Sequence, residues 1–443
     1  MTTQEYQPPA NGYRTFLILW ATQSVSIIGT AVAWFALIVW LTEHSASQEE
    51  LGARLAFIGL VTSIPTVFLA PIIGAFVDRH DRRRIMLVAD SLSGCVSLVA
   101  IALLATNQLS FPLLVAFQFV YLLLGAFHSA AFETSYAMLV PEKQLGRANG
   151  MMQTVFSLAA VVPPALAAIL LALPTGIIGA LLVDVASFVL AALTLAFLRI
   201  PSPRPAEAHT AAGGPRAYLA DIRTGARFVW DRRPIIWLLA TFAVYNAGVT
   251  ALTVLQPAIV RYQQGASAST LGLEFAGALA INEAAAGLGG IVGGVLITTW
   301  GGLRRKRIYG VLVPILVAGA LQMLYGWSAW VWVSAAVLFA WVMLEPVMNS
   351  HSQAIWQTHT PREMQGRVFA VRRVIAWGVR PLATVVVGVL TARGVDAGIV
   401  VVALGLLTVV WCGVNLFNPQ LAHIDDKGYL DEYAARRQTV AET

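Results

Sequence analysis

Charged residues are scarce in this chain. Of its 443 residues, only 12% are Asp, Glu, Lys or Arg, whereas 58% are hydrophobic. An average soluble domain is about 25% charged, because its surface has to be hydrated. The shortage of charge argues against a soluble fold and indicates that lipid replaces water around much of the protein.

Cysteine and the usual catalytic motifs are equally scarce. Cys95 and Cys412 both lie inside apolar runs, without the spacing of a metal site. The seven histidines are scattered, and no HExxH, GxSxG or P-loop pattern occurs. No basic stripe with interleaved aromatic residues points to nucleic acid. We therefore expect no enzymatic activity, no cofactor, no metal and no nucleic-acid partner.

Long apolar runs dominate the sequence instead. A helix needs roughly 20 apolar residues to cross a bilayer, and twelve runs qualify, in two groups of six. We therefore predict an all-α integral membrane protein with twelve transmembrane helices in two pseudo-symmetric six-helix bundles. The predicted spans are Phe16–Leu41, Leu55–Val77, Ile85–Ala105, Phe111–Phe132, Ala148–Leu173, Gly176–Leu198, Ile235–Val260, Leu271–Trp300, Ile308–Trp327, Trp330–Ile355, Val368–Thr391 and Val395–Phe417.

The basic residues predict the orientation of these spans. Loops on the cytoplasmic side carry an excess of Lys and Arg, and nearly all of the 29 fall on one side when the N-terminus is cytoplasmic. Arg54, Arg261 and Arg393 lie on the other side, and Arg380 lies within a span. We expect a multi-pass protein of the cell (inner) membrane with both termini in the cytoplasm.

The two groups of spans repeat one another. LVPEKQLGRANG after the fourth span is echoed by THTPREMQGRVFA after the tenth, with matching residues 220 positions apart, and RRRIM after the second span by RKRIY after the eighth. Duplicated bundles of this kind are a transporter plan, with the binding site between them. We predict an N-terminal bundle at 1–198, a cytoplasmic linker with an amphipathic interfacial helix at 199–234, a C-terminal bundle at 235–418 and a cytoplasmic tail at 419–443.

The turn between spans two and three, GAFVDRHDRRRIMLV, is unusually rich in charge for so apolar a chain. Its pattern Gly74-x-x-x-Asp78-Arg79-x-x-Arg82-Arg83 resembles the signature loop of the major facilitator superfamily. The first span and the two repeated segments resemble one branch of that superfamily, which holds macrolide-efflux proteins and the enterobactin exporter among bacterial drug:proton antiporters. The resemblance covers nearly the whole chain.

This resemblance implies a rocker-switch transporter, in which two bundles open alternately inward and outward. It implies that the signature loop acts as a conformational latch on the cytoplasmic side. Asp78 would face the start of span eleven, where Arg372 or Arg373 would pair with it, and Gly74 would permit close helix approach.

The sequence departs from the family pattern at three places. Asp81 stands where the signature loop usually has glycine, Tyr121 where many antiporters carry arginine, and Pro163-Pro164 where Gly-Pro is usual.

Four charges fall near the middle of predicted spans: Asp184, Glu283, Glu345 and Arg380. A charge at the bilayer centre costs a few kcal/mol, so each needs a partner or a function. Glu345 and Arg380 lie on consecutive spans and are placed to pair. Proton coupling through Glu345 or Glu283, a static ion pair, and direct substrate contact all remain open. For Asp184 we expect a structural role.

Polar stripes on spans one, four, seven and ten supply candidates for the substrate cavity, with hydrogen bonding between helices as the alternative. Asp90 and Glu133 lie toward span ends, where we expect them to pair with loop arginines. Gly289/Gly293 and Gly290/Gly294 have the spacing of close helix packing. The cavity candidates are Gln23, Trp34, Tyr121, His128, Asn246 and Asn349.

The function these features favour is secondary active efflux of amphipathic small molecules such as antibiotics, by proton-coupled antiport. The alternative is a dedicated exporter of one metabolite, such as a siderophore or a lipid. The expected partners are a small-molecule substrate, protons and membrane lipid, and we expect the protein to act as a monomer.

Overall fold

The computed structural model describes residues 9, 11–65, 69–77, 79–141, 144–200, 215–361, 364–426 and 428–429. Helices make up almost all of this part of the chain, and it contains no β-strand. Eleven of its helices are long and apolar enough to cross a membrane. The predicted all-α membrane fold is confirmed, and eleven of the predicted spans each coincide with one helix apart from a few residues at the ends.

The predicted span Leu55–Val77 is the exception. Two helices, α2 (Gln48–Ser63) and α3 (Ala70–Val77), share its region, and neither is long enough to cross a bilayer alone. Residues 66–68, between these two helices, lie outside the described residues, so a single span at Leu55–Val77 stays a prediction. The described residues hold eleven helices of spanning length and do not test the twelfth predicted span.

The helices form two compact units. The first comprises Met1–His44 and Val61–Ala212, and the second Ser45–Leu60 and Gly213–Thr443. Most of α2 thus belongs to the second unit, although the sequence pattern assigns it to the first half of the chain.

Contacts of α2 with α15 (Gln365–Ala392) account for this grouping. A Cβ atom on Gly52 would lie only 2.9 Å from the Cβ of Thr391, so the two helices approach closely there. At the start of α2, Gln48 Nε2 donates to Asp396 Oδ2 at 2.9 Å.

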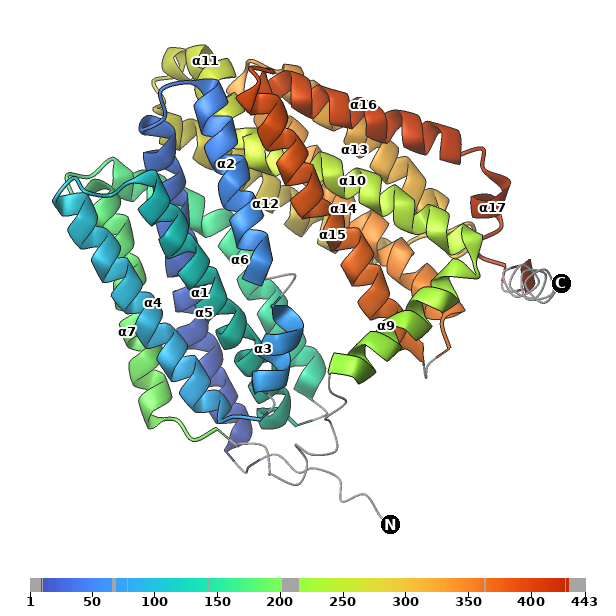
Figure 1. The fold of residues 1–443 in the computed structure, drawn as a ribbon, viewed down its shortest axis with the longest axis horizontal. Coiled ribbons are helices and arrows are strands. Elements are labelled where there is room, and N and C mark those ends of the chain that lie inside the picture. Colours follow the sequence, from blue (N-terminus) through green and yellow to red (C-terminus); the bar gives the residue numbers. More distant parts are fainter. Residues whose placement is uncertain are drawn as a thin grey trace. The chain divides into compact units, whose positions relative to one another are not determined.

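In the first unit, α1 packs on α6 and α7, and α4 packs on α5 and α7. A buried apolar cluster that includes Phe16, Met86, Phe132 and Leu139 joins α1, α4 and α5. Figure 1 shows these helices in blue to green. They are α1 (Gly12–Glu43), α3, α4 (Arg82–Ala105), α5 (Phe111–Leu139), α6 (Leu145–Leu171) and α7 (Gly176–Phe197).

In the second unit, α12 packs on α14, α13 on α14 and α16, and α10 on α15 and α16. Figure 1 shows them in yellow-green to red. Besides α2 and α15, they are α9 (Pro215–Trp230), α10 (Arg233–Ala258), the π-helix η3 (Ile259–Gln263), α11 (Gly265–Thr270), α12 (Phe275–Trp300), α13 (Tyr309–Trp327), α14 (Val331–His359), α16 (Ala397–Asn415) and α17 (Pro419–Ala422).

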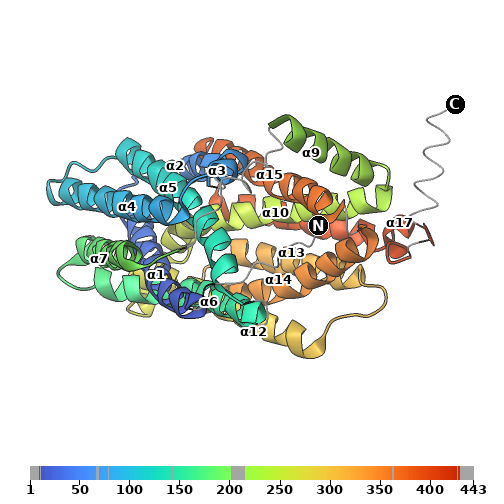
Figure 2. The same cartoon turned by 90° about the horizontal axis from the view of Figure 1, so that it is seen from below.

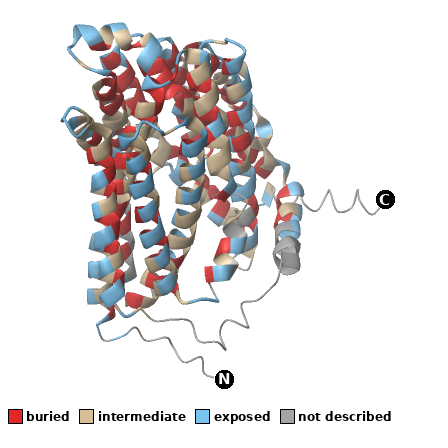
Figure 3. Cartoon of the chain, turned by 60° about the vertical axis from the view of Figure 1, so that its left-hand side comes forward, coloured by how far each residue is buried: buried red, intermediate tan, exposed pale blue. Residues whose placement is uncertain are grey.

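Large apolar side chains cover the outside of both units. Phe197 is 86% exposed, Leu382 68% and Leu193 55%, and Figure 3 shows buried and exposed residues alternating around the helices. Such a surface is unfavourable in water but not in lipid, whose tails are as apolar as leucine. The described helices therefore have the surface of a membrane-embedded protein.

Glycine packing joins α12 to α14, as the sequence predicts. A Cβ atom on Gly289 would lie 2.2 Å from the carbonyl oxygen of Phe339, and one on Gly293 would lie 2.1 Å from that of Met343. Gly294 has no atom within 4 Å of the corresponding position. Only the Gly289/Gly293 pair therefore forms the close contact, which allows the two backbones to touch.

We expect Gly293→Ala to destabilise the protein by about 1–3 kcal/mol, because the added methyl group forces α12 away from α14. Gly294→Ala is the matched control and should be neutral or slightly stabilising, since alanine favours helix over glycine by about 1 kcal/mol. Thermal unfolding of the purified variants measures both. Equal melting temperatures would refute the packing described.

The described part of the segment between the two sets of spans contains one helix, α9, which lies within the range predicted for an amphipathic helix. Its Gly225 packs against the backbone of Arg367 at the start of α15, where a Cβ atom would lie 2.5 Å from the Arg367 carbonyl oxygen. Phe228 and Val229 are buried. Figure 2 shows α9 lying beside α15 and α10, so α9 is docked to the second unit.

Candidate functional site

Glu345 lies half-buried on α14 and receives a hydrogen bond from a neighbouring helix. The hydroxyl of Tyr245, on α10, donates to Glu345 Oε1 at 3.0 Å. Tyr245 is 4% exposed, and its ring lies 6.3 Å from that of Trp341 on α14. The carboxyl group is therefore held at a fixed position inside the second unit.

Arg380, on α15, is bound by Asn246, the residue that follows Tyr245 on α10. Its Nη2 donates to Asn246 Oδ1 at 3.3 Å, and its guanidinium lies 5.3 Å from the ring centre of Trp377. Among the described residues, no ion pair within 4.0 Å joins Arg380 to Glu345. The two charged groups instead contact consecutive residues of α10: Glu345 contacts Tyr245, and Arg380 contacts Asn246. The side chains of these two residues point in directions about 100° apart around the helix axis.

The polar stripe of α14 continues beyond Glu345. Asn349 is exposed, one turn further along the helix. Gln353 Oε1 accepts from Arg372 Nη1 at 2.6 Å, and Ser352 Oγ accepts from Arg372 Nη2 at 3.2 Å. The predicted stripe thus ends in a contact that joins α14 to the first turns of α15.

Glu283, on α12, is more isolated. Among the described residues its side chain has no hydrogen bond and no ion pair, and it is half-buried. The adjacent Asn282 is fully buried and donates to Gln264 Oε1 at 2.9 Å, while Gln264 donates to Ser334 Oγ at 2.9 Å. Glu283 is thus a partly buried carboxyl group next to a hydrogen-bond network in which it takes no part.

In the first unit, three hydroxyl groups converge on Asp184, which is 0% exposed. Ser97 and Tyr121 donate to Asp184 Oδ2 at 2.7 and 2.6 Å. Thr30 donates to Oδ1 at 3.2 Å. These residues come from α7, α4, α5 and α1, so the carboxyl group ties four helices together, and Tyr121, a predicted cavity residue, points into this cluster.

A second polar cluster surrounds Asp90 on α4. Gln23 Nε2, from α1, donates to Asp90 Oδ2 at 3.2 Å. Nε2 of His128, from α5, lies 3.4 Å from Asp90 Oδ1. Two predicted cavity residues therefore meet a buried aspartate, which contacts them and not the loop arginines we expected. Trp34 lies half-buried further along α1.

The predicted latch residues are distributed around the start of α4. Asp78 lies outside the described residues, so its contact with span eleven stays a prediction. Gly74 has no atom within 4 Å of a Cβ position, and Arg79 is exposed. Asp81, where the family has glycine, caps α4 by accepting from the Arg84 N–H at 3.1 Å.

Two latch arginines brace helix ends inside the first unit. Arg82 contacts the carbonyl oxygen of Thr134 and the sulfur of Met138, near the end of α5. Arg83 donates to the carbonyl oxygens of Leu195 and Ala196 at the end of α7. Helix C-termini leave carbonyl groups unpaired and favour cations, so Arg83 satisfies two carbonyl groups that α7 leaves unpaired.

The second unit has a comparable contact near the end of α14. Arg307, in the corresponding loop, donates to Thr358 Oγ1 at 3.0 Å near the end of α14. Met138 and Thr358 are 220 positions apart, the offset of the repeated sequence segments. In the repeated segments RRRIM and RKRIY, however, Arg307 aligns with Arg84 and not with Arg82, so the two contacts are similar in position but are not made by equivalent arginines.

Comparison with known families identifies the chain. The family model for the Major Facilitator Superfamily matches residues 19–384. This chain belongs to that superfamily.

Two kinds of curated relatives within the superfamily are similar to it. Macrolide efflux protein A of Streptococcus pyogenes is 26% identical over 367 residues, covering 80% of this chain and 84% of that protein. The multidrug efflux pump Tap of Mycobacterium tuberculosis is 26% identical over 428 residues, covering 93% and 94%.

Solved transporter structures share the superfamily fold. The nucleoside transporter NupG aligns with a TM-score of 0.72 at 11% identity, covering 90% of this chain and 99% of that one. A bacterial homologue of the human lysosomal transporter Spinster aligns with a TM-score of 0.62 at 14% identity, covering 97% and 96%. At these identities the likeness concerns the fold alone.

Two residues of these polar clusters, Tyr245 and Asp90, were not selected as site candidates from the sequence. Tyr245 lies next to Asn246 and off the predicted stripe of α10, so helical spacing gave no reason to select it. Asp90 was assigned to a loop contact because of its place near a span end. Gln23 and His128 could have indicated its contacts, because both are polar residues within spans and neither had an assigned hydrogen-bond partner.

Proposed function

We propose that this superfamily member is an efflux transporter that exports amphipathic, largely apolar small molecules in exchange for protons. Macrolide antibiotics are the first substrate class to test, because macrolide and multidrug efflux proteins are similar along most of the chain. We place the protein in the inner membrane with both termini cytoplasmic, as the distribution of Lys and Arg predicts.

The arrangement around Glu345 carries the proposal. A carboxyl group within a membrane helix is costly when charged, so it is a natural place to bind a proton. Tyr245 holds this carboxyl group, and the neighbouring Asn246 holds Arg380. Loss of the negative charge on Glu345 changes the electrostatic environment of Arg380, and α10 connects the two.

Such a change can drive transport only when the proton binds one conformation more tightly than the other. In our proposal, protonated and ionised Glu345 favour different positions of α10 and α15. Proton movement down its gradient then forces the alternation between inward- and outward-open states. Substrate leaves the cell during this alternation, through a cavity lined by residues such as Asn349 and Asn246.

Efflux from living cells tests the function. We expect expression in a bacterial host without its own drug pumps to lower the accumulation of a radiolabelled macrolide relative to an empty vector. A protonophore should restore accumulation to the vector level. Accumulation unaffected by expression would remove export of this class, and lower accumulation that persists with the protonophore would remove proton coupling. A panel of dyes and siderophores in the same assay distinguishes a multidrug exporter from a dedicated one.

A further inference from the structure

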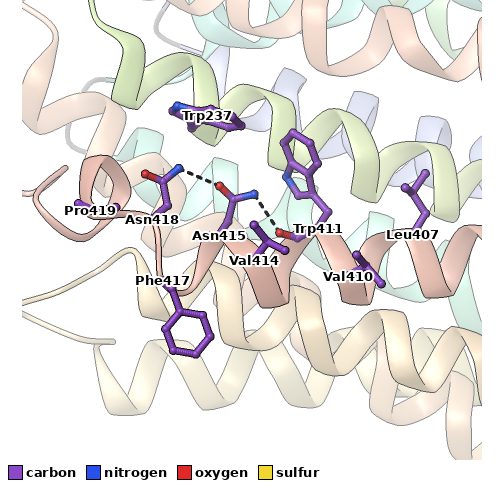
Figure 4. Close-up of a pocket in the computed structure, with 9 residues that line it drawn as sticks. All are labelled: Trp237, Leu407, Val410, Trp411, Val414, Asn415, Phe417, Asn418 and Pro419. Atoms are coloured by element: carbon purple, nitrogen blue, oxygen red, sulfur yellow. Dashed lines mark hydrogen bonds between the residues drawn. The ribbon is translucent and has the colours of Figure 1, made fainter.

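An apolar groove of about 460 Å³ lies on the second unit, between α10, α16 and the segment that leads into α17. Figure 4 shows its lining residues, with Trp237 of α10 and Trp411 of α16 close to each other. Their ring centres are 5.8 Å apart. The volume lies within the range of small-molecule sites, about 300–1,000 Å³. The lining residues are Trp237, Leu407, Val410, Trp411, Val414, Asn415, Phe417, Asn418 and Pro419.

The polar atoms of this groove are already occupied by the protein. Trp237 Nε1 donates to Gln420 Oε1 at 3.0 Å, and Trp411 Nε1 donates to Thr241 Oγ1 at 3.1 Å. The amides of Asn415 and Asn418 bond to each other at 3.1 Å. The groove therefore offers hydrocarbon and ring faces to an occupant, and favours one with an apolar body.

A cation lies next to one end of the groove. Arg233 is exposed and precedes Trp237 by four residues, so both side chains lie on the same face of α10, about 6 Å apart along the helix axis. Among the described residues, Arg233 has no hydrogen bond or ion pair from its side chain. The guanidinium is thus available to an anion whose apolar part lies against Trp237.

The position of these residues fits the boundary between lipid and water. α10 begins at Arg233 and α16 ends at Asn415, so both helices have an end beside the groove. Tryptophan is enriched at membrane–water boundaries. An occupant at this level has its apolar part among the helices and its charged part at their ends.

We propose that this groove binds an anionic phospholipid, with an acyl chain along the apolar side chains of Leu407, Val410 and Val414 and the phosphate on Arg233. Charge complementarity and the apolar lining select this occupant over a second protein or a soluble anion. The inference does not depend on the proposed transport function.

Native mass spectrometry of the purified full-length protein tests it, with added phosphatidylglycerol and phosphatidylcholine as probes. We expect wild type to retain phosphatidylglycerol preferentially. Arg233→Gln should weaken that retention about fivefold, the equivalent of about 1 kcal/mol for one cation at a membrane surface. Arg305→Gln, which removes an exposed guanidinium from the α12–α13 loop of the same unit, is the matched control and should leave retention unchanged.

A second pair of variants tests the apolar part. Leu407 lines the groove, whereas Leu406 does not. The two residues are similarly exposed, Leu407 at 47% and Leu406 at 48%, so they form a matched pair. Leu407→Trp should fill the groove and abolish retention of both lipids, whereas Leu406→Trp should behave as wild type. Val410→Trp fills the same space if the Leu407 variant does not fold.

Three outcomes would overturn the proposal. The first is equal lipid retention by the Leu407→Trp and Leu406→Trp proteins, which would place bound lipid elsewhere. The second is identical lipid preference in the Arg233→Gln and Arg305→Gln proteins, which would leave the phosphate without its cation. The third is retention of a macrolide and not of lipid, lost in Leu407→Trp, which would make the groove a drug site.

Discussion

We expect the Glu345→Gln variant to lose gradient-driven efflux to the level of an empty vector while still binding its substrate. Glutamine keeps the size of the side chain and accepts the hydrogen bond from Tyr245, but it cannot bind or release a proton. If Glu345 couples protons to transport, the protein then has no means of using the gradient. Binding of a radiolabelled macrolide to purified protein and uptake into inverted membrane vesicles measure the two properties separately.

Two further variants test whether the loss of efflux is specific to proton binding by Glu345. Glu274→Gln makes the same chemical change at an exposed residue before α12, and should transport as wild type. Tyr245→Phe removes the hydroxyl donor but leaves Glu345 titratable, so we expect a partial loss that varies with pH. Unchanged efflux by Glu345→Gln would assign coupling to another group, with Glu283 the first to examine. Loss of binding together with efflux would favour direct substrate contact instead.

The largest effect on stability should follow Asp184→Ala. The substitution leaves the hydroxyls of Thr30, Ser97 and Tyr121 without their common acceptor. Hydrogen bonds between membrane helices contribute about 0.6–1.7 kcal/mol each, so we expect the protein to lose about 2–5 kcal/mol. Thermal unfolding in detergent, followed by the monodisperse fraction, measures the loss.

Comparison variants separate a structural role from a transport role. Asp184→Asn keeps the shape and part of the acceptor capacity, so it should be destabilised less and should retain efflux per folded molecule. Ser187→Ala removes a buried hydroxyl that bonds only to the backbone of α7, and should cost less than 1 kcal/mol. A stable Asp184→Ala protein that has lost efflux would show that Asp184 takes part in transport.

The fold could be predicted from the sequence because lipid imposes strong constraints on it. Each helix that spans a membrane must be long and apolar, and such runs are visible by inspection. The span predicted at Leu55–Val77 includes residues 66–68, which lie outside the described residues, so it stays a prediction.

The candidate site was predicted less completely. Asp184 was expected to be structural, but its hydroxyl partners could not be named, because hydropathy does not specify how a helix is rotated or at which height it meets its neighbours. The same reason explains Arg380, which contacts Asn246 and is linked to Glu345 only through α10. The spacing of four selected both Gly289/Gly293 and Gly290/Gly294, and only the rotation of α12 determines that the first pair contacts α14.

The most direct test of the account is transport by the purified protein in proteoliposomes under an imposed pH gradient. With a radiolabelled macrolide on both sides, the account predicts that the substrate accumulates against its own gradient on the acidic side. Accumulation should collapse when the pH gradient is dissipated, and should be absent with Glu345→Gln. Macrolide movement that proceeds equally with and without the gradient would contradict proton-coupled export.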